Sequence, residues 1–171
     1  TFAINYLLNK NPDIVIIHAS SKNSFYFNTA SNKQFFCLVG NEGYRLEKKL
    51  KTLILDQKKF VLPPFPRKMG TYIPNIVSQN TFELPLMDFT DKYHDSHTSL
   101  AIQTAKGLGV NEILLVGYDG YSGSFISEIE QDLVFENEYM FSEIIKKGIK
   151  VTSITPTKYK RVDYNSIYSL I

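Results

Sequence analysis

The chain has 171 residues and a formal net charge of +2, because 19 basic residues nearly balance 17 acidic ones. This balance argues against a nucleic-acid surface as the main purpose of the protein. No apolar run approaches the roughly 18 residues that a membrane-spanning helix needs. Apolar residues make up 43% of the chain, and its length suits one domain with a proper core, so we expect a single domain over residues 1–171.

The single cysteine, Cys37, cannot form a disulfide within the chain and lies in the apolar run FFCLV, which predicts a buried small hydrophobic residue. Unpaired cysteine and the lack of a visible signal peptide favour a cytoplasmic protein. The chain begins at Thr1 without an initiator Met and enters an apolar pattern at once, so we expect the C-terminal fragment of a longer protein. Two clusters of cations are interpreted as solvated faces: Lys48, Lys49 and Lys51, and Lys158, Lys160 and Arg161.

Hydrophobic spacing predicts the elements of the N-terminal third. Two compact runs, DIVIIHA and QFFCLVG, are typical of strands buried on both faces. In chain order we predict a helix over 2–9, a strand over 13–19, a polar loop over 20–24, a strand over 34–40, a helix over 44–51 and a short strand over 52–56.

Residues 57–93 differ from the rest because they are dense in proline, which fixes φ and removes a backbone donor. The prolines are Pro63, Pro64, Pro66, Pro74 and Pro85. We predict an irregular excursion with short strands, since a long loop without any structure would be unusual. It would act as a cap over the sheet edge or as an arm that binds a partner.

The clearest pattern begins at Asp95 or Ser96, either of which can cap a helix that runs through Lys106 and ends at Gly107 and Gly109. There follow a buried strand over 112–117, a Gly/Ser loop over 118–124, a long amphipathic helix from Ile126 to Ile145, a strand over 149–154 and a polar tail after Pro156. This alternation predicts an α/β fold with a three-layer, mainly parallel, Rossmann-like sheet flanked by helices, and with the excursion at 57–93.

Ligands of open parallel sheets bind beyond the carboxyl ends of the strands. Three loops of this chain follow predicted strands, and we expect them to converge around one crevice. Their candidate ligand-binding residues are His18 and Ser20, then Gly40, Asn41 and Glu42, and finally Gly117, Tyr118 and Asp119. Of these, Asp119 is the strongest candidate, because a carboxylate there could hold a ribose hydroxyl or a magnesium ion on a nucleotide phosphate. The alternative for Asp119 is a turn-forming residue before glycine.

A second candidate is the start of the helix at 96–99, SHTS. Its free N–H groups could hold a phosphate or carboxylate, with Ser96, Thr98 and Ser99 as further donors and His97 as a source of charge or a proton. Simple capping by Asp95 or Ser96 is the alternative.

Other motifs are missing or incomplete. The chain has no Gly-x-Gly-x-x-Gly motif and no Walker loop. The sequence GYSG at 120–123 misses the spacing of Gly-x-Ser-x-Gly, which disfavours a Ser-His-Asp hydrolase. His94 and His97 are three residues apart but lack a third ligand, so they do not predict a metal site.

The stretch SHTSLAIQTAKGLGVNEILLVGYDGY at 96–121 resembles the nucleotide-binding half of the family of 6-hydroxymethylpterin pyrophosphokinase-like proteins and motility-associated glycosyltransferases. Bacterial sialyltransferases have a similar fold. The resemblance implies nucleotide binding. The chain departs from the family in lacking a Gly-rich Pro-Ser loop after its first strand.

The segments FAINYLL, DIVIIHAS, FFCLVG and LLVGYDGY, in this order, are similar to the C-terminal extension of bacterial aldolases of the 4-hydroxy-2-oxovalerate type from surface-polysaccharide gene clusters. The resemblance implies that an aldolase barrel with its metal ligands precedes this chain and is its partner. The chemistry of the extension itself stays open.

Three functions follow as alternatives. The preferred one is an accessory domain of an aldolase-like protein that binds a nucleotide or a phosphosugar, with Asp119 on the ribose or a magnesium ion and with Ser96, Thr98 and Ser99 on phosphate. The second is a transferase that uses a nucleotide-activated donor, with His97 as acid or base. The third is an interaction module whose excursion at 57–93 binds the preceding barrel or a sister subunit of a homo-oligomer.

Overall fold

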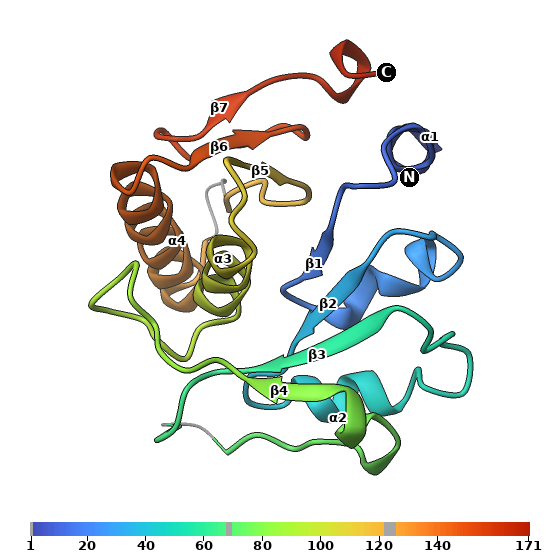
Figure 1. Ribbon diagram of the computed structural model, residues 1–171. Coiled ribbons are helices and arrows are strands. Elements are labelled where there is room, and N and C mark those ends of the chain that lie inside the picture. The colour runs from blue at the N-terminus through green and yellow to red at the C-terminus, as the bar shows by residue number, and fades with distance from the viewer. Residues whose placement is uncertain (1, 68–69, 122–125) are drawn as a thin grey trace. The chain divides into compact units, whose positions relative to one another are not determined.

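The computed structural model describes residues 2–67, 70–121 and 126–171 (Figure 1). The chain divides into two compact units, Thr1–Thr104 and Ala105–Ile171, and each is described by itself. The described strands form a four-stranded and a three-stranded sheet, and every pairing within them is parallel. The chain is therefore an α/β protein of Rossmann-like architecture, as the sequence predicted, whereas a single domain over 1–171 stays a prediction.

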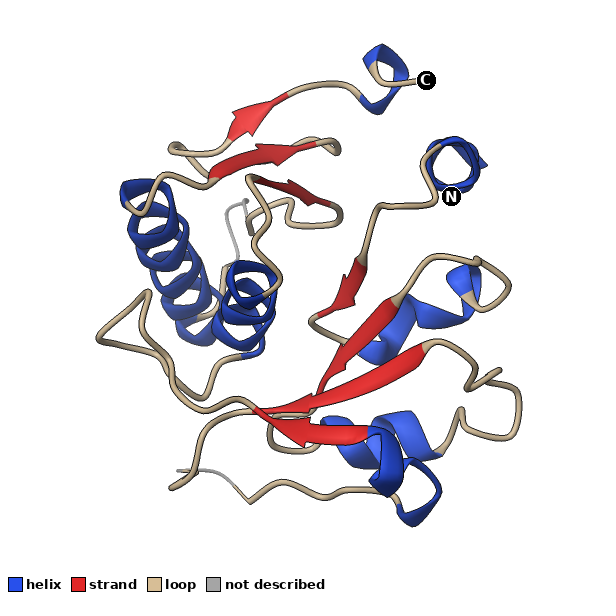
Figure 2. Ribbon diagram, viewed as in Figure 1, coloured by secondary structure: helices blue, strands red, loops and turns tan. Residues whose placement is uncertain are grey.

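The first unit holds a parallel sheet in the order β1-β2-β3-β4. Figure 2 shows short helices, in blue, along one side of its four red strands. The elements in chain order are α1 (Phe2–Lys10), β1 (Ile16–His18), the 3-10 helix η1 (Ser21–Phe27), β2 (Gln34–Cys37), α2 (Glu42–Glu47), β3 (Lys58–Leu62), the 3-10 helix η2 (Asn75–Asn80) and β4 (Thr81–Glu83). Helix α3 (His97–Gly107) begins in this unit and ends in the second.

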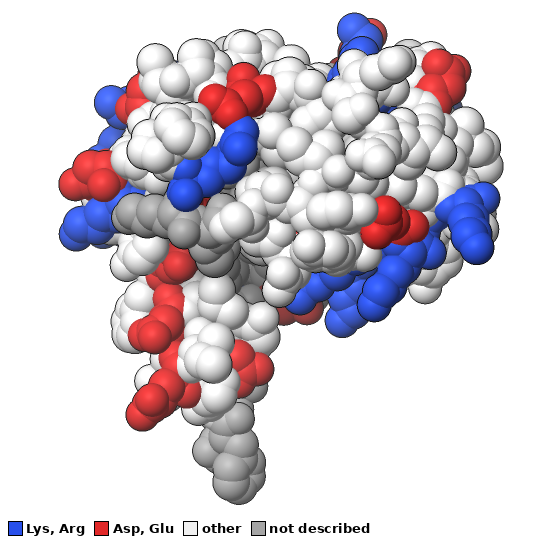
Figure 3. Space-filling model, turned by 90° about the horizontal axis from the view of Figure 1, so that it is seen from below, with Lys and Arg blue, Asp and Glu red and all other residues white. Residues whose placement is uncertain are grey.

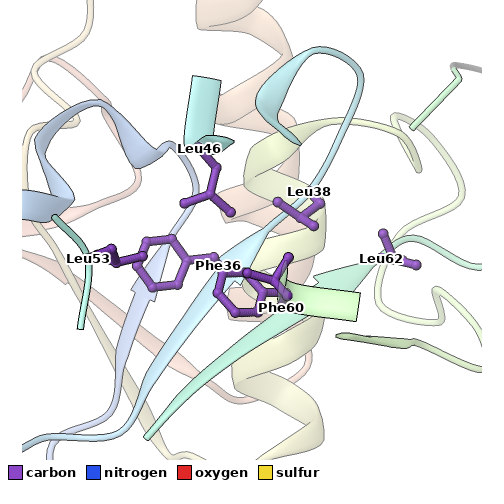
Figure 4. Packing of buried hydrophobic residues seen from close by; sticks show 7 residues of the cluster. Phe36, Leu38, Leu46, Leu53, Phe60 and Leu62 are labelled. Carbon is purple, nitrogen blue, oxygen red and sulfur yellow. The ribbon is translucent and has the colours of Figure 1, made fainter. Parts of the chain in front are cut away.

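Alternation along the strands divides the apolar side chains of the first unit between two faces. On one face, the rings of Phe36 and Phe60 stack with their centroids 5.3 Å apart, and Leu46 of α2 packs against them (Figure 4). On the other face, Cys37 and its neighbours pack against Leu100 of α3. The sheet of this unit thus lies between two helical layers. Cys37 is only 1% exposed, so its predicted burial is confirmed.

The second unit is built on a strand-helix-strand pattern. It contains β5 (Glu112–Leu115), α4 (Glu128–Lys146), β6 (Lys150–Ser153), β7 (Asp163–Tyr164) and the 3-10 helix η3 (Ile167–Ser169), with the strands in the order β5-β6-β7. A capping box fixes the start of α4, because the side chain of Ser127 accepts from the backbone N–H of Glu130 and the Glu130 carboxylate accepts in return. The ring of Phe141 packs edge-on against Tyr118 and Tyr159.

Most predicted elements are confirmed, with boundaries that differ by a few residues. The strand expected over 52–56 is wrong, and the loop expected over 20–24 is part of the 3-10 helix η1. The excursion at 57–93 does contain short strands, but it is neither a cap nor an arm in its first part, since β3 lies between β2 and β4 in the sheet. Part of the Gly/Ser loop at 118–124, including Ser122 and Gly123 of GYSG, lies outside the described residues.

The surface carries charged side chains of both signs (Figure 3). On the face shown in Figure 3, Lys and Arg side chains and Asp and Glu side chains are interspersed, with wide uncharged areas between them. No helix in the described ranges combines the length and the apolar character that crossing a membrane requires.

Candidate functional site

The clearest polar cluster of the first unit lies where β1 and β2 end. Ser21 follows β1, Glu42 follows β2 and opens α2, and His97 opens α3. The Glu42 carboxylate contacts both of the other residues: Oε1 accepts from the backbone N–H of Ser21 at 2.5 Å, and Oε2 lies 3.7 Å from Nε2 of His97. The structure therefore brings together two of the three predicted strand-end loops and the predicted helix start.

Glu42 is the most buried charged group of this cluster, with 2% of its surface exposed. A buried carboxylate is tolerated only when it is paired and hydrogen-bonded. Here the pairing comes from Arg45, one helical turn along α2, whose Nη1 lies 3.3 Å from Oε2. The guanidinium of Arg45 is 64% exposed, so its remaining donors are available at the protein surface. Glu42 thus links the loop after β1, the start of α2 and the start of α3, and it holds the side chain of Arg45 in place.

His97 is held close to neutral by its surroundings. Partial burial lowers the pKa of its imidazole, the Glu42 carboxylate raises it, Arg45 lowers it, and a hydrogen bond with the Val39 backbone raises it. The net lowering makes the neutral ring the main form at pH 7. Its Nε2 is buried and, within the described part of the chain, has no hydrogen-bond partner, because 3.7 Å is too long for one.

The hydroxyl of Ser21 is a second buried polar atom without a hydrogen-bond partner among the residues described. Ser21 is 2% exposed, and its own N–H is bound to Glu42. Unsatisfied buried polar atoms are rare in proteins and mark places where structure alone does not explain the residue. Two of them beside one buried carboxylate make this edge of the sheet the best candidate for a site.

The hydroxyls at the start of α3 are used by the helix itself. The Ser96 hydroxyl accepts from the N–H of Ser99 at 3.0 Å, and the Ser99 hydroxyl donates to the Ser96 carbonyl at 2.9 Å. Thr98 is buried, with 8% exposed. The capping function that the sequence left as an alternative is therefore present, with Ser96 as the cap.

His18 and Ser20, the candidates after β1, also have structural partners. The His18 ring stacks on Phe36 at 4.4 Å, and its Nε2 lies 2.9 Å from Oε1 of Gln34. Burial lowers the pKa of His18 to about 4, against the effect of the Gln34 hydrogen bond. The Ser20 hydroxyl accepts from the N–H of Lys22 at the start of η1. Both side chains are thus used in packing and capping.

In the second loop, Gly40 and Asn41 shape the backbone before α2. Gly40 has a φ of +52°, a left-handed conformation that glycine adopts without strain. Asn41 stands at the cap position of α2 but makes no side-chain capping bond.

The candidates of the second unit lie at the carboxyl ends of β5 and β6. The N–H of Gly117 donates to the Thr155 hydroxyl at 3.0 Å, and the carbonyl of Tyr118 accepts from the Thr157 hydroxyl at 2.7 Å. The carbonyl of Asp119 accepts from the N–H of Lys158 at 2.8 Å.

The Asp119 carboxylate is exposed and makes no hydrogen bond within the described ranges. It is therefore available to a ligand of the second unit. Its predicted meeting with His18 and Asn41 around one crevice stays a prediction, because those residues belong to the other unit.

Sequence reasoning missed Arg45, and it placed Ser21 in the loop after the first strand without making it a candidate ligand contact. Arg45 had a usable signal, since an acid and a base three residues apart on a helix are neighbours. Ser21 had only its position in that loop, because the burial of its hydroxyl and the bond from its N–H to Glu42 depend on the tertiary fold. Across the residues that the structure covers, no group of three His, Cys, Asp or Glu side chains could hold a metal ion. A pocket of about 470 Å³ in the first unit lies beyond the end of α2, and none of the cluster residues lines it.

Comparison with models of protein families, with curated proteins and with solved structures found no match.

Proposed function

We propose that this chain binds a nucleotide or a phosphorylated sugar at the carboxyl ends of β1 and β2. The observation that supports the proposal best is the buried Glu42 carboxylate, which joins Ser21, Arg45 and His97 at this edge. Burying a carboxylate costs desolvation free energy that its ion pair only partly returns, so packing alone gives little reason for Glu42 at this position. A preformed polar arrangement of this kind suits the binding of a polar ligand.

Each residue of the cluster has a distinct part in this proposal. The exposed guanidinium of Arg45 supplies bidentate donors that match a phosphate group. The neutral His97 ring, with 37% of its side chain exposed, can contact a sugar or ribose, whereas its Nε2 and the Ser21 hydroxyl are buried and would bind a ligand hydroxyl only after a local movement of the loop after β1. Glu42 does not touch the ligand but holds these groups in position. The preceding aldolase barrel, suggested by the family resemblance, would be the partner of this binding unit.

The test is a set of thermal melts of the chain with nucleoside diphosphates, nucleotide sugars and sugar phosphates, each with magnesium. A ligand that binds only the native state raises the melting temperature, since at 100 times its dissociation constant it adds about 2.7 kcal/mol of stability. We expect at least one ligand to do so, and Arg45→Ala to remove the effect. Arg161→Ala, an exposed arginine of the second unit, is the matched control.

The outcomes separate the alternatives. If no ligand raises the melting temperature, the binding proposal is wrong and the interaction module is favoured. If the effect survives Arg45→Ala but not Asp119→Ala, the ligand binds to the second unit instead. If the chain consumes a nucleotide sugar and releases the nucleotide, it is a transferase.

A further inference from the structure

A pocket of about 470 Å³ opens on the first unit between η1 and the turns that follow α2. Its volume lies within the range of small-molecule sites, roughly 300 to 1,000 Å³. The residues that line it include Phe25 and Asn28 of the η1 side and Lys48, Lys49 and Leu53 of the other side. The cluster around Glu42 lies at the start of α2 and shares no residue with this pocket.

Two sets of hydrogen bonds hold the walls of this pocket at a fixed separation. At one end, the Lys49 ammonium donates to the Ser21 carbonyl at 2.5 Å and also to the Lys22 carbonyl. At the other end, the Asn28 amide donates to the Thr52 carbonyl at 2.7 Å and accepts from the N–H of Ile54 at 2.8 Å. Because η1 and the segment after α2 are tied at both ends, the pocket between them is preformed.

The lining of the pocket combines an aromatic wall, an apolar floor and a cationic rim. Phe25 is 54% exposed, and its ring contacts that of Tyr26 with the centroids 3.9 Å apart. Leu53, 9% exposed, is part of the core cluster beneath and forms the floor. Lys48 is exposed and forms no ion pair with any described residue.

We infer that this pocket binds a small aromatic anion, a planar ring that carries a phosphate or carboxylate group. The ring would stack on Phe25 over Leu53, and the anionic group would pair with Lys48 at the rim. Lys49 is already bound to two carbonyls, so it shapes the pocket and adds positive potential. The site is separate from the carboxyl edge and does not depend on the function proposed there.

The test is titration of the full chain with naphthyl phosphate and naphthoate, followed by fluorescence and by amide chemical shifts. We expect both probes to bind and to shift residues 24–28 and 48–53. Naphthol and inorganic phosphate, which each lack one half of the recognised chemistry, should bind at least about tenfold more weakly. A preference for one anionic probe identifies the natural group as phosphate or carboxylate.

Substitutions in the pocket test whether the probes bind there. Lys48→Ala should weaken binding about three- to fivefold, and Phe25→Ala about tenfold. The matched controls Lys51→Ala and Phe65→Ala, both exposed and outside the pocket, should bind as the original chain does. Arg45→Ala should also leave binding unchanged, which separates this site from the carboxyl edge. Equal binding of inorganic phosphate or naphthol, or unchanged affinity in both pocket variants, would overturn the inference.

Discussion

The two units use different interactions to hold the loops that follow their parallel strands. In the first unit, a buried carboxylate joins the loop after β1 to the starts of α2 and α3. In the second unit, the Thr155 hydroxyl accepts a hydrogen bond, the Thr157 hydroxyl donates one, and a backbone bond forms at Asp119. These neutral bonds hold the loops, and the Asp119 carboxylate stays exposed. Neutral bonds suffice to hold such loops, so the charge in the first unit needs a reason beyond loop closure. That comparison favours the first unit as the polar ligand site.

Among the variants that test this comparison, Glu42→Ala should lower the free energy of unfolding the most. Glu42→Ala leaves the buried Ser21 N–H unpaired and removes the acceptor of Arg45, and it should lower the free energy of unfolding by about 3 kcal/mol. Urea unfolding at pH 7 measures this. Glu42→Gln keeps an acceptor for Ser21 and should lose less. A loss below about 1 kcal/mol in Glu42→Ala would mean that the charge does not hold the loops.

The next largest effect is a dependence of the free energy of unfolding on pH, which His18 of the first unit causes. The pKa of His18 is lowered to about 4 in the folded chain, against 6.5 when exposed. Between these values the unfolded chain binds more protons than the native one, so stability falls as the pH falls. From pH 7.5 to pH 5 the loss due to His18 should be about 2 kcal/mol.

Urea unfolding at several pH values checks the prediction for His18. His18→Gln should flatten the curve without abolishing the slope, because the lowered pKa of His97 acts in the same direction. His94→Gln, at an exposed histidine, serves as the control. An equal slope in His18→Gln and in the original chain would contradict the assignment.

In the second unit, removing a hydrogen bond that holds a strand-end loop should lower the free energy of unfolding by less than Glu42→Ala does in the first. Thr157→Val removes the hydroxyl that donates to the Tyr118 carbonyl and keeps the shape of the side chain, so it should cost about 1 kcal/mol. Urea unfolding at pH 7 again provides the measurement, with Thr29→Val, at an exposed threonine of the first unit, as the control. A cost near that of Glu42→Ala would erase the energetic difference between the two units.

Sequence patterns predicted the strands that lie in continuous apolar runs, such as β1 and β2, because burial on both faces demands such runs. They were wrong at 52–56, where apolar residues indicated a strand that the structure does not contain. There the side chain of Asn28 binds the Thr52 carbonyl and the Ile54 N–H, the backbone groups that a strand would use. No local pattern reveals a bond across more than twenty residues.

The neighbouring strand β3 falls within the predicted irregular excursion, which was assigned from the density of prolines over 57–93. Lys58 is nevertheless 3% exposed, with its ammonium 3.3 Å from the Asn28 carbonyl. A buried lysine contradicts the usual preference of charged residues for the surface. In the candidate site, Glu42 and His97 were predicted as ligand contacts. The burial of Glu42 and its link to Ser21 depend on the tertiary fold and could not be predicted.

The smallest expected effect is at Asp119, and it completes the comparison. Because this carboxylate is exposed and its loop is held by backbone bonds, Asp119→Ala should change the free energy of unfolding by less than about 0.5 kcal/mol. Urea unfolding of this variant beside Glu42→Ala gives the contrast directly. A loss of more than 1 kcal/mol would show that the side chain supports the turn before Gly120, as its position before a glycine with a φ of +73° allows. Stability unchanged together with a lost ligand effect would instead make Asp119 a binding residue, because a residue that holds no structure can lose only function.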